Sequence, residues 1–239
     1  MSGADPSAWS GLLGLHQRLL RRPGAAAEGG MLQPAGTRPP RDFEPTFVAL
    51  EPYRPVGDSA LTALRDAANL DDLAEAALDG ALLATVGAEG PVHLDVLVAR
   101  LLAQVSQSRS SARLRGMVQK RLQGLAAAGV LTQQAGFSAM QSQLRTPPYR
   151  DWRSQNQRLR RLDHVHDREL MQALWRVVDE QEGASTDSVM NDALHRIGFI
   201  RLTANARERL AAPLAALLEA RLLASRNDRL WLGEAAFQR

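Results

Sequence analysis

The sequence predicts a mainly α-helical fold with small β-hairpins, in the α+β class, in which two similar units follow an N-terminal arm. Two observations predict it. Apolar residues recur three and four positions apart over most of the chain, which is the spacing of amphipathic helices. The same order of apolar gaps then occurs twice, which indicates an internal repeat. A chain of 239 residues has room for one large domain or two small ones, each with its own core.

The N-terminal arm comes first. Residues 1–44 are rich in glycine, alanine and proline, and they carry too little apolar surface to offset the entropy of ordering them. We therefore expect a flexible arm that holds one short amphipathic helix, at about residues 8–22. Its apolar face is the predicted partner-binding site, formed by Trp9, Leu12, Leu13, Leu19 and Leu20. This helix either folds back on its own protein or docks on a partner, and both interpretations remain open.

Each unit is predicted to contain three helices. The first helix carries three apolar residues spaced four apart: Leu78, Leu82 and Val86 in one unit, and Leu170, Leu174 and Val178 in the other. In the second helix, Leu97 and Leu101 correspond to Met190 and Leu194. The third helix repeats most closely, because the apolar gaps of 4, 3, 5 and 1 that start at Val118 recur from Leu210. A chance match of this length is improbable.

A short strand pair is predicted after each third helix. In the first unit the strands flank a turn that contains Gly136, and in the second they flank Asn227-Asp228, which is a strong two-residue turn signal. Three helices closed by a β-hairpin describe a winged helix-turn-helix domain. The sequence thus predicts a first winged-helix domain with a leading helix at residues 45–145, a basic linker at 146–162 and a second winged-helix domain at 163–234.

Charge is concentrated in the middle of the chain. Residues 101–161 carry 11 basic and one acidic side chain, a net charge of +10, whereas the chain as a whole has a net charge of +3. Such asymmetry indicates a polyanionic partner for this segment. In a helix-turn-helix the third helix enters the major groove of DNA, and Arg113, Gly116 and Lys120 fall on the outer side of that helix.

The linker adds arginines with Tyr149 and Trp152 among them, a mixture that can clamp phosphates and stack on bases. The predicted DNA-binding residues are Arg109, Arg113, Arg115, Lys120, Arg145, Arg150, Arg153, Arg158, Arg160 and Arg161. The alternative is a solvated basic linker, or a basic face that binds an acidic protein.

The second unit is less suited to DNA. Pro213 falls inside its third helix, where it must kink or divide the helix, and Glu208 and Glu219 place negative charge along it. We expect this unit to pack against another copy of the chain, giving a homodimer, or against a different protein.

Catalytic signals are weak. The chain has no cysteine, no phosphate-binding glycine loop and no nucleophile elbow, so we expect neither an enzyme nor a cofactor. His164 and His166 could share a face and hold a metal if their segment were extended. A polar linker leading into a helix is the favoured interpretation, so no metal site is predicted. No apolar run reaches the length of a membrane span and no secretory signal opens the chain, so a cytoplasmic protein without a membrane partner is expected.

Four short motifs resemble one family. They are Glu89-Gly90-Pro91-Val92-His93, Arg109-x-x-Ala112-x-x-Arg115-x-x-Val118, Pro147-Pro148-Tyr149-Arg150-Asp151 and Ile197-Gly198-Phe199-x-Arg201. In this order they resemble the tandem winged-helix segment at the C-terminal end of large superfamily-one helicase-like proteins, many of them linked to restriction and defence loci. The likeness covers roughly residues 46–233. Because no helicase or nuclease region precedes the motifs, the resemblance implies a stand-alone tandem winged-helix protein.

These observations lead to two functional hypotheses. The first is a non-enzymatic protein that binds double-stranded DNA through the third helix of the first domain and the basic linker, in a prokaryotic defence or DNA-processing system. The second is an adaptor subunit of a larger DNA-acting ATPase, helicase or nuclease complex, which would use the arm and the acidic second unit to grip its partner.

Overall fold

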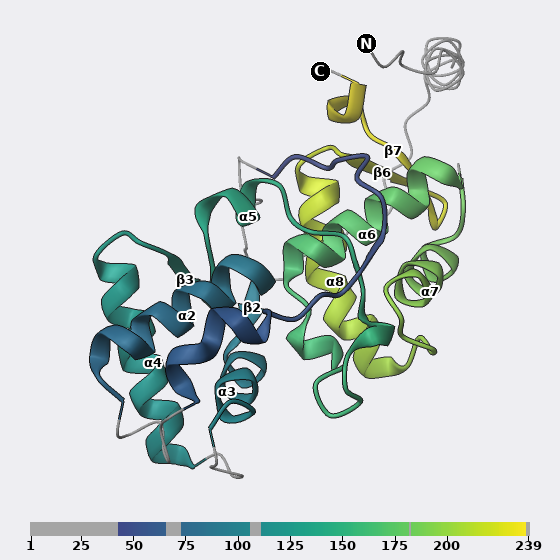
Figure 1. Ribbon diagram of the computed structural model, residues 1–239. Helices are drawn as coiled ribbons and strands as arrows, with labels where there is room; N and C mark the ends of the chain where they lie inside the picture. Colours follow the sequence, from purple (N-terminus) through teal and green to yellow (C-terminus); the bar gives the residue numbers. More distant parts are fainter. Residues whose placement is uncertain (1–42, 66–72, 106–110, 182, 238–239) are drawn as a thin grey trace, which may run out of the picture.

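The computed structural model describes residues 43–65, 73–105, 111–181 and 183–237 (Figure 1). The described chain is mainly helical with three small sheets, which confirms the predicted α+β class. The predicted arm helix, with Trp9, Leu12, Leu13, Leu19 and Leu20, lies outside the described residues. Within the described ranges, no helix combines the length and the apolar character needed to cross a membrane.

The first unit contains helices α2 (Glu75–Glu89), α3 (Leu94–Leu102) and α4 (Ala112–Ala127). Strand β2 (Val92–His93) precedes α3, and strands β3 (Thr132–Gln134) and β4 (Phe137–Ala139) follow α4. The three strands form one antiparallel sheet in the order β2-β4-β3. The short helix α5 (Gln141–Arg145) closes the unit. The apolar residues predicted to face inward are buried, with Leu82, Val118 and Leu122 fully inaccessible to solvent.

The second unit repeats this order. It contains α6 (Asp167–Glu180), α7 (Thr186–Arg196) and α8 (Ala204–Glu219), followed by the antiparallel strands β6 (Leu223–Arg226) and β7 (Arg229–Leu232). A single antiparallel bridge between Ser185 and Arg229 lies where β2 pairs in the first unit. Helix α8 runs from Ala204 to Glu219 with Pro213 inside it, so of the two expected effects of this proline, a kink or a division, the helix is not divided.

Capping residues and turns set the limits of these elements. The hydroxyls of Ser111 and Thr203 accept the N–H groups of Leu114 and Ala206, so that α4 and α8 begin in the same way. Both hairpins turn through two residues with positive φ, Ala135-Gly136 in the first unit and Asn227-Asp228 in the second. The sequence predicts both turns correctly.

An ion pair also repeats between the units. Arg115 on α4 pairs with Asp95 on α3, and Arg207 on α8 pairs with Asp187 on α7. Each pair spans 20 residues of sequence. In both units, therefore, the third helix is joined to the second by the same charged contact.

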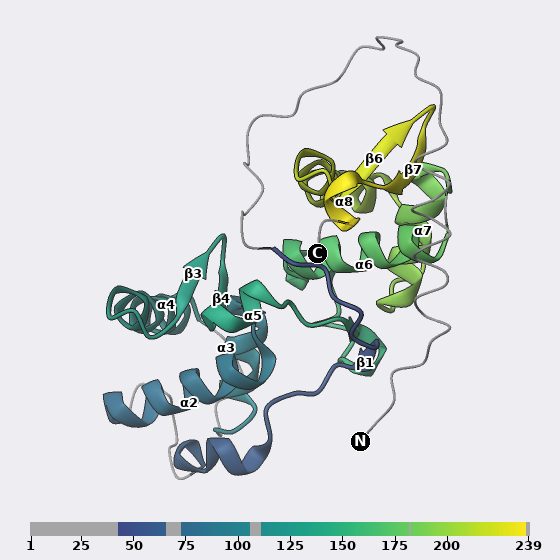
Figure 2. The same cartoon turned by 90° about the horizontal axis from the view of Figure 1, so that it is seen from above.

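The segment before the first unit ties the two units together. We call residues 43–56 the strap. At one end the Thr46 N–H donates to Gln172 Oε1 on α6, at 3.0 Å. At the other end the Tyr53 hydroxyl and the Val56 N–H donate to the buried carboxylate of Glu89 on α2, each at 2.8 Å. Figure 2 shows this segment running from α6 towards the first unit.

The predicted linker is part of the packed structure. Strand β5 (Arg150–Asp151) pairs in parallel with β1 (Glu51–Pro52) of the strap, and a 3-10 turn at Trp152–Ser154 follows. Tyr149 and Trp152 are buried in the core of the second unit, so they are not placed to stack on bases as predicted. Before α2 the structure describes a 3-10 helix at Asp58–Leu64.

Candidate nucleic-acid surface and histidine cluster

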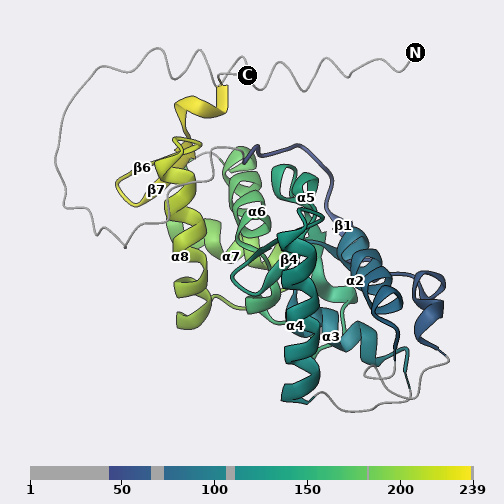
Figure 3. The ribbon, with the colours of Figure 1, turned by 90° about the vertical axis from the view of Figure 1, so that its left-hand side faces the viewer.

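Helix α4 is amphipathic and has one side open to solvent. Leu114, Val118 and Leu122 form its buried face. In a view of the outer side of the first unit, α4 lies in front (Figure 3). The helix contains four basic residues and no carboxylate. Its surface therefore carries positive charge with no negative charge of its own to offset it.

The exposed side of α4 carries basic and amide side chains. Arg113, Gln119, Lys120 and Gln123 are all exposed, and Lys120 forms no ion pair with any residue that the structure describes. Gly116 lies among them, and a Cβ atom added there would meet nothing within 4 Å. The absence of a side chain at this position allows another molecule to approach the helix backbone closely.

The other two basic residues of α4 hold the first unit together. Arg115 pairs with Asp95, and Arg121 reaches across to α2, where it pairs with Asp79 and with Glu75, the latter at 2.8 Å. Both are partly accessible, but their charge is offset by these carboxylates. Lys120, which pairs with no carboxylate that the structure describes, thus adds uncompensated positive charge to the helix surface beside the exposed Arg113.

The prediction that Arg150 contacts DNA is wrong. Its side chain is buried and donates to both carboxylate oxygens of Glu169, at 3.2 and 2.6 Å. It also donates to the Glu89 backbone carbonyl at 2.6 Å and lies 4.5 Å from the ring centroid of Tyr53. Burial alone would lower the pKa of Arg150, but the Glu169 carboxylate keeps that pKa above its ordinary value. Arg150 is a charged contact between the units and does not reach the surface.

The remaining residues that the sequence predicts to bind DNA lie on several different elements. Arg153 pairs with Asp151 at 2.7 Å, and Arg161 lies 3.5 Å from Asp163. Arg145 and Arg158 are exposed, and Arg160 is half-buried. Arg109 lies outside the described residues. Helix α4 lies on the outer edge of the first unit, whereas α5, which carries Arg145, lies on its side towards α6 (Figure 2). The single surface predicted from sequence is therefore reduced to α4 and its neighbourhood.

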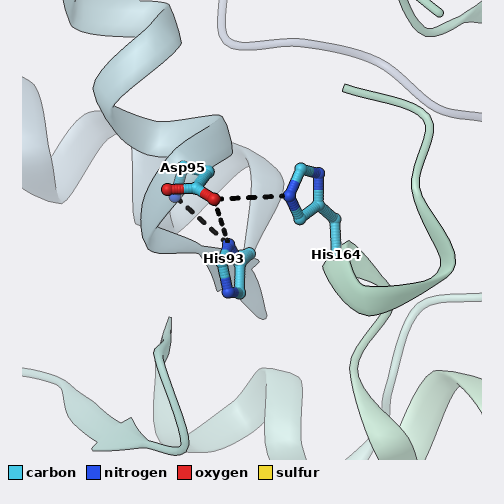
Figure 4. Close-up of side chains that lie close together, drawn as sticks. All are labelled: His93, Asp95 and His164. Atoms are coloured by element: carbon cyan, nitrogen blue, oxygen red, sulfur yellow. Dashed lines mark hydrogen bonds and ion pairs between the residues drawn. The ribbon is translucent and has the colours of Figure 1, made fainter. Parts of the chain in front are cut away.

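A second constellation lies where the two units meet. His93 and Asp95 come from the start of α3, and His164 comes from the segment before α6 (Figure 4). Asp95 Oδ2 is 3.8 Å from His93 Nδ1 and 3.6 Å from His164 Nε2. The two imidazole rings stack at a centroid distance of 4.7 Å. Burial, and then the neighbouring His164, lower the pKa of His93.

Hydrogen bonds and an ion pair to other residues hold His93, Asp95 and His164 in place. His164 is buried, and its Nδ1–H donates to the backbone carbonyl of Leu159 at 2.8 Å. The other carboxylate oxygen of Asp95, Oδ1, is held by Arg115. The backbone N–H of Asp95 donates to His93 Nδ1 at 3.2 Å, which caps α3.

His164 and His166 do not act together as their spacing suggested. His166 caps α6, where its Nδ1 accepts the N–H of Arg168, and its ring packs edge-on against Phe137. Burial lowers the pKa of His166 to about 4, so this residue is neutral near pH 7. The partners of His164 come instead from about 70 residues earlier in the chain, where sequence spacing gives no signal of the contact. The sequence singles out His93 only when the two units are aligned with each other, because the second unit has Ser185 at the corresponding position.

A cavity of about 430 Å³ adjoins this cluster, between the β3–β4 hairpin of the first unit and helices α6 and α8 of the second. Its lining includes His93, Phe137, His166, Arg209 and Pro213. The interface between the units is therefore not fully closed.

The chain was compared with protein-family models, with curated proteins and with solved structures, and none of them matches it.

Proposed function

We propose that this chain is a non-enzymatic protein that binds double-stranded DNA through the outer face of α4. The observation that carries the proposal is the exposed, carboxylate-free surface of that helix, with Arg113, Lys120 and two glutamines around Gly116. Basic side chains at this spacing can contact phosphates, and glutamine can read base edges in the major groove.

The order of elements supports the same proposal. Each unit runs helix, strand or bridge, helix, helix and hairpin, which is the order of a winged helix-turn-helix domain. In that arrangement the third helix is the one that enters the major groove. Helix α4 is the third helix of the first unit, and α8, its counterpart, carries Glu208 and Glu219.

The test is a salt series of duplex binding with the full chain. We expect the double variant Arg113→Ala/Lys120→Ala to bind at least about tenfold more weakly at low salt. Two lost phosphate contacts should also make the slope of log affinity against log salt shallower by about two. Fluorescence anisotropy with a labelled duplex measures both quantities.

The matched control removes the same charge elsewhere. Arg201 and Arg226 are exposed residues of the second unit, and Arg201→Ala/Arg226→Ala lowers the net charge equally. This control should bind duplex as the wild type does. Equal loss in both double variants would mean that only net charge matters, and the α4 proposal would then be wrong.

One observation favours the adaptor role as a second candidate. Ile200, just before α8, is 73% exposed, and the exposed side of α8 combines alanines with Glu208 and Glu219. Apolar and acidic groups together suit a protein partner better than a phosphate backbone. If the wild-type chain leaves duplex DNA unbound at low salt, this candidate takes the place of the first.

A further inference from the structure

We propose that His93, Asp95 and His164 form a binding site for a divalent transition-metal ion of the Zn²⁺ type, which joins the first unit to the second. The proposal is independent of DNA binding. It rests on the spacing of the three ligand atoms, on the hydrogen bonds that orient them and on the chemistry of the ligand set.

The spacing of the three atoms suits a shared cation. One ligand atom from each of His93, Asp95 and His164 lies within 4.8 Å of the other two. The separations of 3.6 and 3.8 Å from Asp95 Oδ2 are too long for hydrogen bonds. Two atoms bonded to one tetrahedral zinc at about 2.05 Å lie about 3.4 Å apart. Shifts of a few tenths of an ångström would therefore bring the two separations from Asp95 Oδ2 to this distance, and the two ring nitrogens would have to lie equally close within their 4.8 Å limit.

The orientation of His164 supplies a second argument. Its Nδ1–H donates to the Leu159 carbonyl, so Nε2 is the ring nitrogen that faces Asp95 and that a cation could reach. A hydrogen bond from the second ring nitrogen to a backbone carbonyl is also the usual support of a metal-binding histidine.

Asp95 is oriented in the same way. Arg115 holds its Oδ1, which leaves Oδ2 directed at both imidazoles (Figure 4). His93 Nδ1 accepts one long backbone hydrogen bond, and a metal bond would replace this single capping contact. One ring nitrogen of each histidine thus faces the same carboxylate oxygen.

The ligand set selects the class of ion. Two imidazoles and one carboxylate are typical of zinc and of the neighbouring first-row metals, and they leave a fourth position for water. His93 also lines the adjoining cavity, which offers a path for the ion to enter. Because His93 and His164 belong to different units, a bound ion would link those units directly.

The test uses the full chain without an affinity tag, stripped with a chelator. We expect one Zn²⁺ per chain by calorimetry, a higher melting temperature with Zn²⁺, and visible absorption bands with Co²⁺ that Zn²⁺ displaces. His164→Ala and Asp95→Asn should each weaken Zn²⁺ binding by at least about 100-fold, the upper end of the loss seen when a supporting partner is removed.

His195→Ala is the control, because His195 is exposed and lies outside the cluster. It should bind Zn²⁺ as the wild type does. Circular dichroism of each variant in chelator shows whether it folds, and two independent variants keep the test open if one does not. A wild type that binds no Zn²⁺, or folded variants that bind it as tightly as the wild type, would overturn the proposal.

Discussion

At the scale of single residues, Arg150 shows how a charge is kept inside this protein. Its guanidinium is buried between the units and is satisfied by Glu169, by backbone carbonyls and by the faces of Tyr53 and Trp152. Removing one member of a buried ion pair leaves the other without compensation, whereas removing both avoids that penalty.

We therefore expect Arg150→Met to lower the free energy of unfolding by about 3–5 kcal/mol. The double variant Arg150→Met/Glu169→Gln should lose less, because it removes both charges and keeps an acceptor for the Trp152 indole N–H, which donates to Glu169 at 3.0 Å. Urea denaturation of the single and double variants measures the difference. A double variant less stable than Arg150→Met would contradict this account of the pair.

At the scale of single elements, α4 contains a glycine that lowers the stability of the helix and leaves its backbone open to a binding partner. A glycine in a helix interior is destabilising by roughly 0.5–1 kcal/mol relative to alanine. At Gly116 a Cβ atom would meet nothing in the protein, so no internal packing requires the glycine. The absence of a side chain at Gly116 therefore matters only to another molecule, such as a duplex that approaches the helix there.

Gly116→Ala should therefore raise the stability of the protein by up to about 1 kcal/mol and weaken duplex binding at the same time. Gly80→Ala, at an exposed and equally open position of α2, should raise stability and leave binding unchanged. Thermal melts and anisotropy titrations separate the two effects. If Gly116→Ala binds DNA as tightly as the wild type, close approach at this position is not needed.

The sequence predicts elements well where the signal is local. The helical spacing around Val118 and Leu210 correctly identifies the third helices and their buried faces, and the turn at Asn227-Asp228 follows from residue types that adopt positive φ. The site is predicted less well. The position of the Arg150 side chain depends on contacts with Glu169 and Tyr53, and that of His164 on contacts with His93 and Asp95. These contacts join segments far apart in the sequence, and no local sequence pattern predicts them. The aromatic residues among the linker arginines were the available sign that this segment is buried.

At the scale of the whole molecule, partly buried polar contacts join the two units and the segment between them. Arg100 of the first unit donates to Glu89 at 2.9 Å and also to Gln155, and Arg168 of the second unit donates to the Leu144 carbonyl. Separating the units would break the Arg100–Gln155 and Arg168–Leu144 contacts and leave polar groups to find other partners.

We expect the chain to unfold in a single cooperative transition. The described tryptophans, Trp152, Trp175 and Trp231, report on the second unit and the segment before it, whereas far-ultraviolet circular dichroism reports on the helices of both units. In a chain lacking the N-terminal arm, and so Trp9, the two signals should give the same midpoint in urea. Two separate midpoints would mean that the units fold independently.

The strap sets limits on how this protein can be dissected. A chain that begins at residue 43 retains the Thr46 bond to α6 and the Tyr53 and Val56 bonds to Glu89. A fragment that begins at residue 57 loses all three and leaves the Glu89 carboxylate with Arg100 as its remaining side-chain partner among the described residues. An expression boundary placed between the two repeats would keep the bonds to Glu89 in the first fragment but would separate Thr46 from Gln172. We therefore expect neither repeat to be a self-contained module for structural or binding work.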